Sequence, residues 1–227
     1  QNLGPIRDTG LIHLSDVTLI IGRQSSGKST FMKVLCHCRW IEKQVMTRLG
    51  NIVQTYTHNN RFVTDLKQFH RIDEMYFQDS TSIFYEGDVI SISLEGKMHN
   101  AKIIRKENTW DSRYNSKISY IPAERNLVSA VRNINSTYKT EDRDVLFNFI
   151  LEWNECRRDF TKNSQLALSL TENFKYYDED GQDYIVLPNN KPITSFYASS
   201  GVQSMMPIDV ISEKNTSLVG KVTKYSV

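Results

Sequence analysis

A stretch near the start of the chain contains the residue types that bind phosphate. Residues 22–30 read Gly-Arg-Gln-Ser-Ser-Gly-Lys-Ser-Thr and fit the pattern G-x-x-x-x-G-K-[ST] at every fixed position. In such a loop the glycines let the backbone turn, so that consecutive N–H groups point at an anion. Lys28 then reaches the β- and γ-phosphates, and the Ser29 hydroxyl is a ligand for Mg²⁺. We therefore predict a nucleotide site formed by Gly22, Gln24, Ser25, Ser26, Gly27, Lys28, Ser29 and Thr30.

The residues on either side of this loop fit a strand–loop–helix unit. Before it, residues 17–21 (Val-Thr-Leu-Ile-Ile) predict a buried β-strand rich in branched side chains. After it, Gly50 stands where a C-terminal cap belongs, and apolar residues recur at helical spacing: Phe31, Leu35, Cys38, Val45 and Leu49. The alternative, a Gly/Ser surface turn with a solvated lysine, is disfavoured by this order of elements.

Length and composition set broad limits. With 227 residues, 39% of them hydrophobic, the chain can form one large or two small domains. A net charge of +2 gives little electrostatic reason to expect tight nucleic-acid binding. The apolar runs are only strand length, so we expect no membrane span, and neither an initiator Met nor a signal peptide opens the chain. Three cysteines favour a reducing cytoplasm, and neighbours such as Cys36-His37-Cys38 on a helix point to different faces, which argues against zinc.

The first half of the chain alternates between predicted strands and helices. Residues 2–14 predict an antiparallel strand pair with a turn at Gly4-Pro5, and residues 62–72 predict a helix. From 83 to 105 the hydrophobic period is two, which predicts an antiparallel sheet. Basic residues of that region fit a solvated strand face better than a DNA contact: Lys97, Lys102, Arg105, Lys106 and Arg113.

A short apolar run then leads into a charged pair. Residues 118–121 predict a strand ended by Pro122, which places Glu124 and Arg125 at a strand C-terminus. Active groups of α/β sheets collect at such ends. Two alternatives stay open for the pair: a nucleotide-sensing or subunit-contact role, and a structural ion pair.

The second half is predicted to be helical and then β-rich. Residues 127–171 read as helical, most clearly at 144–160, and residues 174–187 read as strands joined by an ordinary turn at 178–181. Serines and a glycine at 195–204 precede an apolar run, which predicts a helix N-terminus and thus a second anion-binding position. Pro207 is expected to kink or end that helix early.

Together these motifs resemble the ATPase head of the ATP-binding-cassette (ABC) superfamily, a class of P-loop NTPase also described as AAA ATPases. The soluble RecF, SMC and OLD-like (overcoming-lysogenisation-defect) branch of DNA repair and phage defence is the most similar. Beside the phosphate loop and the run before it, residues 2–6 (Asn-Leu-Gly-Pro-Ile), 120–125 (Tyr-Ile-Pro-Ala-Glu-Arg) and 199–203 (Ser-Ser-Gly-Val-Gln) carry the resemblance, which covers nearly the whole chain.

The resemblance implies roles for particular residues. The family's signature loop, Leu-Ser-Gly-Gly-Gln, contacts the γ-phosphate held by the phosphate loop of the other subunit. Ser200, Gly201 and Gln203 match that loop, whereas Ser199 and Val202 depart from it. The family's Q-loop glutamine has no clear counterpart, and Glu124 or Arg125 would be the sensor residues of that neighbourhood.

The Walker B strand of the family, an apolar run ending in Asp-Glu, is not found. It should follow the signature, but 207–213 do not fit, and 146–152 precede the signature and read as helix. We therefore expect a chain that lacks its C-terminal Walker B part, either as a fragment or through omitted residues, and we assign no catalytic residue.

The expected fold is α/β: an ABC-type P-loop head with a central mixed sheet, an antiparallel β-region and a helical lobe. We divide a single ATPase domain into a P-loop core (1–75), an antiparallel β-region (76–126), a helical segment (127–175) and a hairpin with the signature helix (176–227).

The expected function follows from the resemblance. The head would bind ATP and Mg²⁺, form a homodimer through the signature loop, and switch a linked or partner effector such as a nuclease. It would hydrolyse ATP if the complete chain supplies Walker B, and a DNA contact is left open. The alternatives are a nucleotide-binding module without hydrolysis, a small-molecule phosphotransferase and a transporter ATPase subunit. A phosphotransferase would need an acceptor pocket and an arginine lid, for which no motif stands out.

Overall fold

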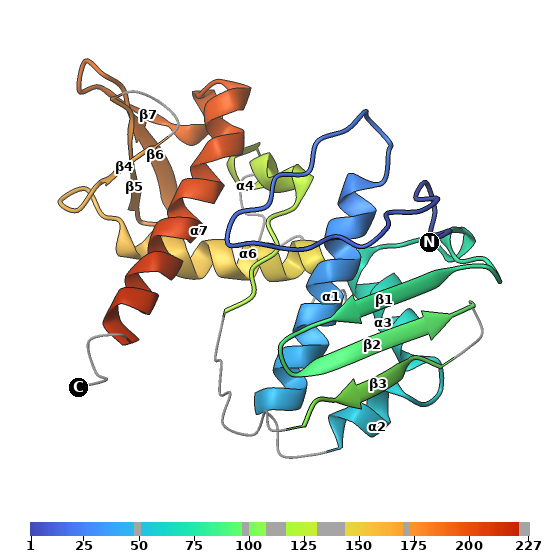
Figure 1. Cartoon of the computed structure of the whole chain (residues 1–227). Coiled ribbons are helices and arrows are strands. Elements are labelled where there is room, and N and C mark those ends of the chain that lie inside the picture. Colours follow the sequence, from blue (N-terminus) through green and yellow to red (C-terminus); the bar gives the residue numbers. More distant parts are fainter. Residues whose placement is uncertain (48–50, 97–99, 108–116, 131–143, 170–172, 223–227) are drawn as a thin grey trace. The chain divides into compact units, whose positions relative to one another are not determined.

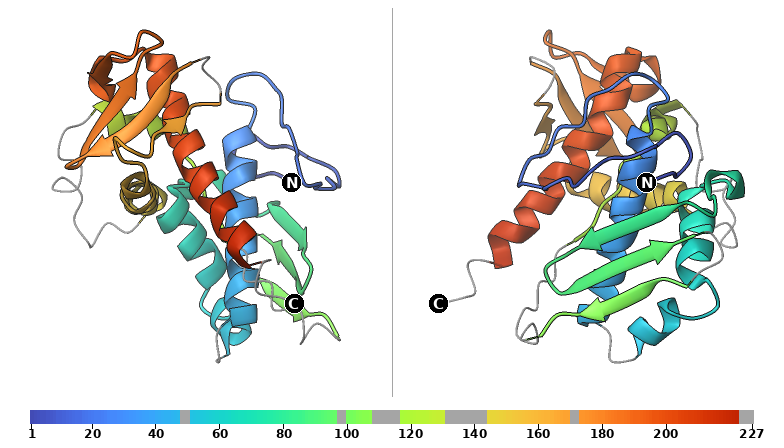
Figure 2. Two further views of the ribbon diagram at one scale, coloured as in Figure 1. Left: turned by 90° about the vertical axis from the view of Figure 1, so that its left-hand side faces the viewer. Right: turned by 45° about the vertical axis from the view of Figure 1, so that its right-hand side comes forward.

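The chain forms two compact units in the computed structural model, Gln1–Ile118 and Ser119–Val227 (Figures 1 and 2). The structure describes residues 1–47, 51–96, 100–107, 117–130, 144–169 and 173–222, with side chains of the last helix described to residue 216. Leu49 and Gly50, which we assigned to the end of the first helix, lie outside these residues. We describe each unit by itself.

In its described residues, unit 1 has three α-helices and a three-stranded antiparallel sheet of order β1-β2-β3. The same helices cover one face of the sheet in both figures. The elements are α1 (Lys28–Thr47), α2 (Ile52–Tyr56), α3 (Arg61–His70), the short 3₁₀ helix η1 (Glu74–Tyr76), β1 (Ser82–Glu86), β2 (Ile90–Glu95) and β3 (Lys102–Arg105). The predicted helices after the loop and near residue 62 are confirmed, as is the antiparallel sheet at 83–105.

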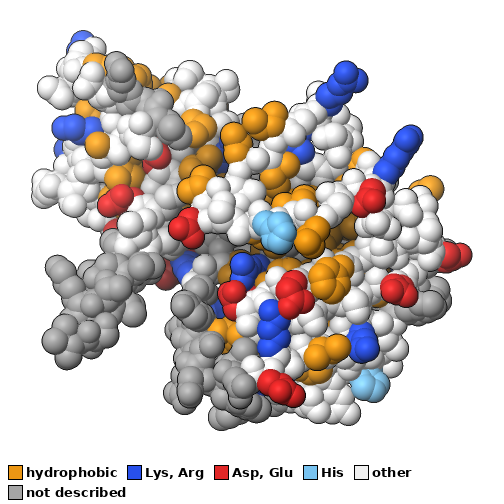
Figure 3. Space-filling view, viewed as in Figure 1, with side chains coloured by type: hydrophobic (Ala, Val, Ile, Leu, Met, Phe, Trp, Pro, Cys, Tyr) orange, Lys and Arg blue, Asp and Glu red, His pale blue; other side chains and the backbone are white. Residues whose placement is uncertain are grey.

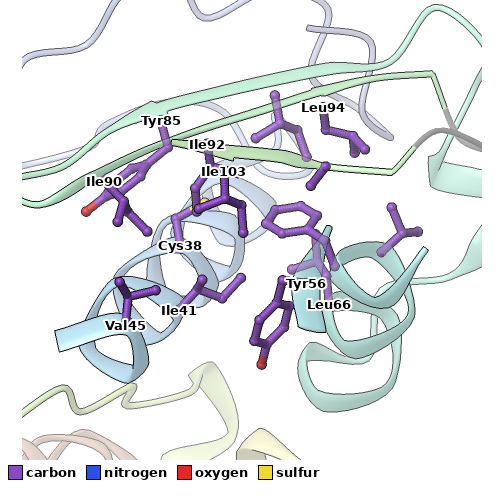
Figure 4. Packing of buried hydrophobic residues seen from close by; sticks show 14 of the residues in the cluster. Cys38, Ile41, Val45, Tyr56, Leu66, Tyr85, Ile90, Ile92, Leu94 and Ile103 are labelled. Carbon is purple, nitrogen blue, oxygen red and sulfur yellow. The ribbon is translucent and has the colours of Figure 1, made fainter. Parts of the chain in front are cut away.

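The burial patterns of β2 and α1 explain how the sheet of unit 1 packs against its helices. Every second residue of β2 is buried, namely Ile90, Ile92 and Leu94, because successive side chains of a strand point to opposite faces. On α1 the buried residues recur at spacings of three and four, which places them on one side of the helix. Figure 4 shows Cys38, Ile41 and Val45 of α1 facing the sheet residues.

A buried carboxylate joins α1 to the β1–β2 turn. Glu42 accepts hydrogen bonds from the Tyr85 hydroxyl at 2.6 Å and from the Val89 amide at 2.8 Å. A side chain on Gly87 would meet this carboxylate, since an added Cβ would lie 2.2 Å from Glu42 Oε1. The pKa of Tyr85 is raised by burial first and by its bond to Glu42 second, so the hydroxyl stays a donor.

The N-terminal segment corrects two predictions. The turn at Gly4-Pro5 is confirmed, because Leu3 and Ile6 form an antiparallel bridge around it, but no strand continues beyond it. Residues 17–21 are not the predicted buried strand: Val17, Leu19 and Ile21 are 87%, 80% and 83% exposed. A β-prone sequence forms a strand only beside a neighbour, and the described residues place none next to this run.

The described part of unit 2 contains a four-stranded antiparallel sheet of order β4-β5-β6-β7 and two long helices, α6 and α7. Its elements are η2 (Ala123–Asn126), α4 (Leu127–Ala130), α6 (Val145–Cys156), η3 (Arg157–Asp159), β4 (Leu166–Ala167), β5 (Lys175–Glu179), β6 (Gln182–Val186), β7 (Pro192–Thr194), η4 (Ser195–Tyr197) and α7 (Ser200–Val222). The core lies between α6, α7 and the sheet, around Phe149, Trp153, Tyr176, Ile185 and Met206. The predicted hairpin at 174–187 and the helix after residue 199 are confirmed.

Three predictions for unit 2 were wrong in part. Residues 118–121 form no strand. Unit 2 begins at Ser119, whose hydroxyl donates a hydrogen bond to the Glu152 carboxylate at 2.5 Å. The helical segment assigned to 127–175 contains β4, because Leu166 and Ala167 pair with β5. Helix α7 continues through Pro207 to Val222 instead of ending early. Residues 131–143 lie outside the described residues.

A charged cluster is buried beside this core. Arg157 contacts Asp178 and, at 3.1 Å, Asp183, while the Tyr176 hydroxyl donates to Asp183 at 2.6 Å. Burial raises the pKa of Asp183 to about 6, against the opposing effect of Arg157 and Tyr176.

The fold is therefore mixed α/β with two small antiparallel sheets. The predicted central mixed sheet is absent from the described part of the chain, where all strand pairs are antiparallel, because residues 17–21 do not join a sheet. Among the helices that the structure describes, none is long and apolar enough to cross a membrane.

Candidate functional site

The phosphate-loop sequence forms a turn whose shape requires glycine at one position. Gly27 has φ of 94°, a conformation that other residues rarely adopt, and Ser25 has φ of 60°. A Cβ on Gly27 would lie 2.4 Å from Cγ1 of Ile6. Both the backbone angle and the packing of the N-terminal hairpin therefore exclude a side chain here.

The loop leads directly into α1. The Phe31 amide donates to the Gly27 carbonyl at 2.9 Å and closes the first turn. The amides of Lys28, Ser29 and Thr30 precede that bond and have no carbonyl partner within the helix, as in the first turn of any helix. These amides and the positive end of the helix dipole are the groups that bind anions.

The lysine of the loop lies over the loop backbone. The Lys28 ammonium donates to the carbonyl oxygens of Gly22, at 2.8 Å, and Arg23, at 2.6 Å. Ser29 is exposed and Thr30 is buried, so of the two hydroxyls only that of Ser29 faces solvent. The lysine charge and the serine hydroxyl thus lie at the same end of α1.

A hollow of about 390 Å³ adjoins the loop. One side is formed by Ser26, Gly27 and Lys28, and the other by the chain that returns from the Gly4-Pro5 turn. That returning segment contributes apolar and polar side chains, including Pro5, Ile6, Arg7, Asp8, Thr9 and Ile12. We predicted the turn but not this lining; the signal was the turn itself, which reverses the chain at Gly4-Pro5.

These residues fit the phosphate groups of a nucleotide and one ligand of a magnesium ion. The fit rests on the Gly27 turn at the start of α1 and on the exposed Ser29 side chain. In the part of the chain that the structure describes, no group of three or more His, Cys, Asp or Glu side chains gathers to hold a metal. A magnesium ion here would take its other ligands from phosphate oxygens and water, as Mg²⁺ commonly does.

The signature-like residues lie at the start of α7 in unit 2. Ser199 caps the helix, since its hydroxyl accepts from the Val202 amide at 3.4 Å. Ser199, Ser200 and Gly201 are exposed. Gln203 turns back instead: its side-chain amide donates to the carbonyl oxygens of Ser195 and Phe196, each at 3.0 Å. Gln203 therefore fixes the loop that precedes the helix.

The fold of unit 2 requires an apolar side chain at residue 202 but does not require glycine at residue 201. A Cβ on Gly201 would meet only the Ser199 hydroxyl, at 4.0 Å, so nothing within this chain requires glycine there. Val202 is 7% exposed and belongs to the core of unit 2. Its departure from the family's second glycine thus has a packing reason.

Arg125 lies against the same helix. Its Nε donates to the Ser204 carbonyl at 2.7 Å, and a second guanidinium nitrogen donates to the Pro122 carbonyl at 3.4 Å. Glu124 is exposed. We left open a structural ion pair as one role of Glu124 and Arg125. Among the described contacts, Arg125 instead binds backbone carbonyls of its own unit, so its structural role is that of a hydrogen-bond donor.

The candidate residues thus form two groups. Residues 22–30 lie in unit 1, and Arg125 and the signature residues are brought together in unit 2. Comparison with protein-family models, with curated proteins and with solved structures found no match to this chain.

Proposed function

We propose that the chain binds Mg·ATP at residues 22–30 and acts as a nucleotide-dependent head of the ABC type. The observation that carries the proposal is the Gly27 turn at the start of α1, where a positive φ and the nearby Ile6 side chain both exclude any residue but glycine. The first amides of α1, its helix dipole and Lys28 all lie at the end of a helix where anions commonly bind. This combination suits a polyphosphate better than a single carboxylate.

Each residue has a defined task in that proposal. The amides of the loop bind the β-phosphate, and Lys28 exchanges its carbonyl partners for phosphate oxygens, which are stronger, charged acceptors. The Ser29 hydroxyl is a magnesium ligand, and the bound ion would neutralise phosphate charge. The base and ribose have room in the hollow beside the loop.

The proposal includes a dimer that forms through the signature-like residues at the start of α7. In a two-fold pair, Ser200 and Gly201 of one subunit would meet the γ-phosphate bound to Lys28 of the other. Gly201 is consistent with this, because nothing within the chain requires glycine at that position. A closely approaching partner or phosphate would explain it. The pair would switch an effector, for which a nuclease is the family's example.

Calorimetry with Mg·ATP tests the nucleotide site. Lys28→Ala should lower the affinity at least about tenfold, equivalent to about 1.4 kcal/mol, because the charge that compensates the phosphates is lost. Lys102→Ala is the matched control, since it removes an exposed lysine of the same unit from β3. Equal ATP affinity in the parent chain and the Lys28 variant would refute the proposal.

Light scattering tests the dimer separately. Ser200→Glu should prevent ATP-dependent pairing, because a carboxylate repels the γ-phosphate, while ATP binding to the monomer is unchanged. Pairing that is unaffected by Ser200→Glu would reduce residues 199–203 to an ordinary capped helix.

A further inference from the structure

Two exposed apolar patches adjoin the two groups of candidate site residues, one patch in each unit. In unit 1, Leu19 and Ile21 are 80% and 83% exposed and lead directly into the phosphate loop. Figure 3 shows hydrophobic side chains gathered over this N-terminal segment. In unit 2, Phe196 and Tyr197 are 44% and 71% exposed and lie just before the signature-like residues 199–203. Adjacent exposed apolar side chains, unlike isolated ones, mark interaction surfaces.

The aromatic patch of unit 2 is fixed by hydrogen bonds of its own backbone. Phe196 and Tyr197 form the short 3₁₀ helix η4 with Ser195, and their rings meet edge to face with centroids 5.2 Å apart. The Gln203 side chain donates to the carbonyl oxygens of Ser195 and Phe196, which joins η4 to α7. Because η4 is already ordered, its aromatic side chains lose little freedom on binding, as an interface anchor requires.

An exposed charge lies beside each patch, and the two charges have opposite sign. Arg23 follows the first glycine of the phosphate loop, and its side chain is exposed. Glu124 is exposed next to Arg125, whose Nε donates to the Ser204 carbonyl near the start of α7. Within the described part of the chain, neither Arg23 nor Glu124 forms an ion pair. We call Glu124, Phe196 and Tyr197 the η4 surface, and Leu19, Ile21 and Arg23 the loop surface.

We propose that the η4 surface docks on the loop surface of a second copy of this chain. The aromatic rings of one copy pack on the apolar side chains of the other, and Glu124 pairs with Arg23 across the interface. The inference rests on the proposed function, because the proposed dimer brings residues 199–203 of one copy to the phosphate loop of the other. A second copy is the occupant because each chain carries both complementary surfaces, and a two-fold pair covers both of them.

Charge exchange tests the ion pair. Pairing of the 227-residue chain is followed by light scattering at a Mg·ATP concentration that calorimetry shows to be saturating for each variant. Glu124→Arg and Arg23→Glu should each raise the dissociation constant of the pair at least about tenfold, because like charges then meet at both contacts. The double variant restores opposite charges and should pair within about threefold of the parent chain. Glu213→Arg is the matched control, since it reverses an exposed glutamate further along α7.

Removal of an aromatic ring tests the apolar contact. Tyr197→Ser should raise the dissociation constant of the pair at least about tenfold, because buried aromatic anchors carry much of the binding energy of an interface. Phe84→Ser is the matched control, since it removes a 65% exposed aromatic side chain from β1. Thermal unfolding of each variant verifies that it is folded.

The results separate this inference from the proposed function. Pairing that survives both single charge reversals, or a double variant that pairs no better than the single variants, would overturn the docking of the η4 surface. Parent-like pairing of Tyr197→Ser would overturn the apolar contact. In each of these cases the nucleotide site and the dimer tested by Ser200→Glu still stand. A parent chain that binds ATP without pairing would overturn the proposed dimer, and this inference with it.

Discussion

The two units bury ionisable groups in opposite ways. Unit 1 buries His37 and His70, whose ring centroids lie 5.7 Å apart. Unit 2 buries Arg157 together with Asp178 and Asp183. A neutral histidine resists gaining a proton, whereas a buried aspartate favours gaining one. The same fall in pH should therefore weaken one unit and strengthen the other.

In unit 1, burial lowers the pKa of both histidines. The pKa of His37 falls to about 4, because desolvation outweighs its bond to the Phe62 carbonyl. The pKa of His70 falls to about 3, because of burial first and then the nearby His37 and Lys33. A base with a lowered pKa on folding stabilises the fold above the unfolded pKa near 6.5, and that stability is lost as the pH falls below it.

In unit 2 the sign is reversed. The pKa of Asp183 rises from 3.8 to about 6, so the folded state holds the proton more tightly than the unfolded state. Its contribution is fully present below pH 3.8 and is lost as the pH rises through about 6. Mild acid should therefore favour unit 2 until other groups titrate.

The largest expected effect comes from removing the charge that holds the unit 2 cluster together. Arg157→Met keeps an apolar stem of similar length but leaves the carboxylates of Asp178 and Asp183 without their cation. Loss of one partner of a buried ion pair costs about 3–5 kcal/mol. Denaturant unfolding monitored by amide exchange of α6 and β5 should show this loss, with β2 of unit 1 unaffected.

The matched control is Arg158→Met, because Arg158 is exposed and adjacent in sequence. It should change stability by less than about 0.5 kcal/mol. A loss of equal size in both variants would show that the cluster contributes nothing specific.

The next effect, acid titration, compares the units directly. Between pH 7 and 5 unit 1 should lose up to about 2 kcal/mol per buried histidine, from about 1.4 kcal/mol per pKa unit. Over the same range unit 2 should gain about 1 kcal/mol through Asp183. Exchange of β2 and β6 amides, corrected for the intrinsic pH dependence of exchange, measures both. Stability changes of the same sign at β2 and β6 would contradict the expected difference between the two units.

The smallest effect contrasts the two glycines at the helix starts. Gly27→Ala introduces a Cβ 2.4 Å from Ile6 and a strained φ, and should destabilise unit 1 by about 1–3 kcal/mol. Gly201→Ala meets open space and should stabilise unit 2 by at most about 1 kcal/mol. Thermal unfolding measures both changes.

The same glycine pair sharpens the functional assignment. Gly201→Ala should weaken ATP-dependent pairing although it stabilises the monomer. A variant that is more stable and pairs as well as the parent chain would argue that Gly201 has no partner.

Local signals were enough to predict much of the fold. The alternation of Ile90 and Ile92 with serines predicted β2, and the turn residues at 178–181 predicted the β5–β6 hairpin. In the structure Asp180 and Gly181 both have positive φ. The loop and the two helix starts were also predictable, because glycine, serine and lysine at fixed spacing act within a few residues. These features depend on near neighbours in the chain.

The failures concern features that depend on distant partners. Residues 17–21 have strand composition, yet pairing must come from another segment, and the sequence does not reveal which segment is near. Arg125 could not be matched to the Ser204 carbonyl because 79 residues separate them. The same holds for the contact of Ile6 with Gly27, which positions the candidate site and left no periodic signal.

The exposed run at 17–21 has a practical consequence for handling the protein. It is a short, uncharged, β-prone segment without proline, and Val17, Leu19 and Ile21 project their side chains into water. Segments of this kind are templates for edge-to-edge assembly into cross-β aggregates. Concentrated samples should therefore self-associate through this run, and replacing Leu19, 80% exposed, with lysine would act as a gatekeeper against precipitation.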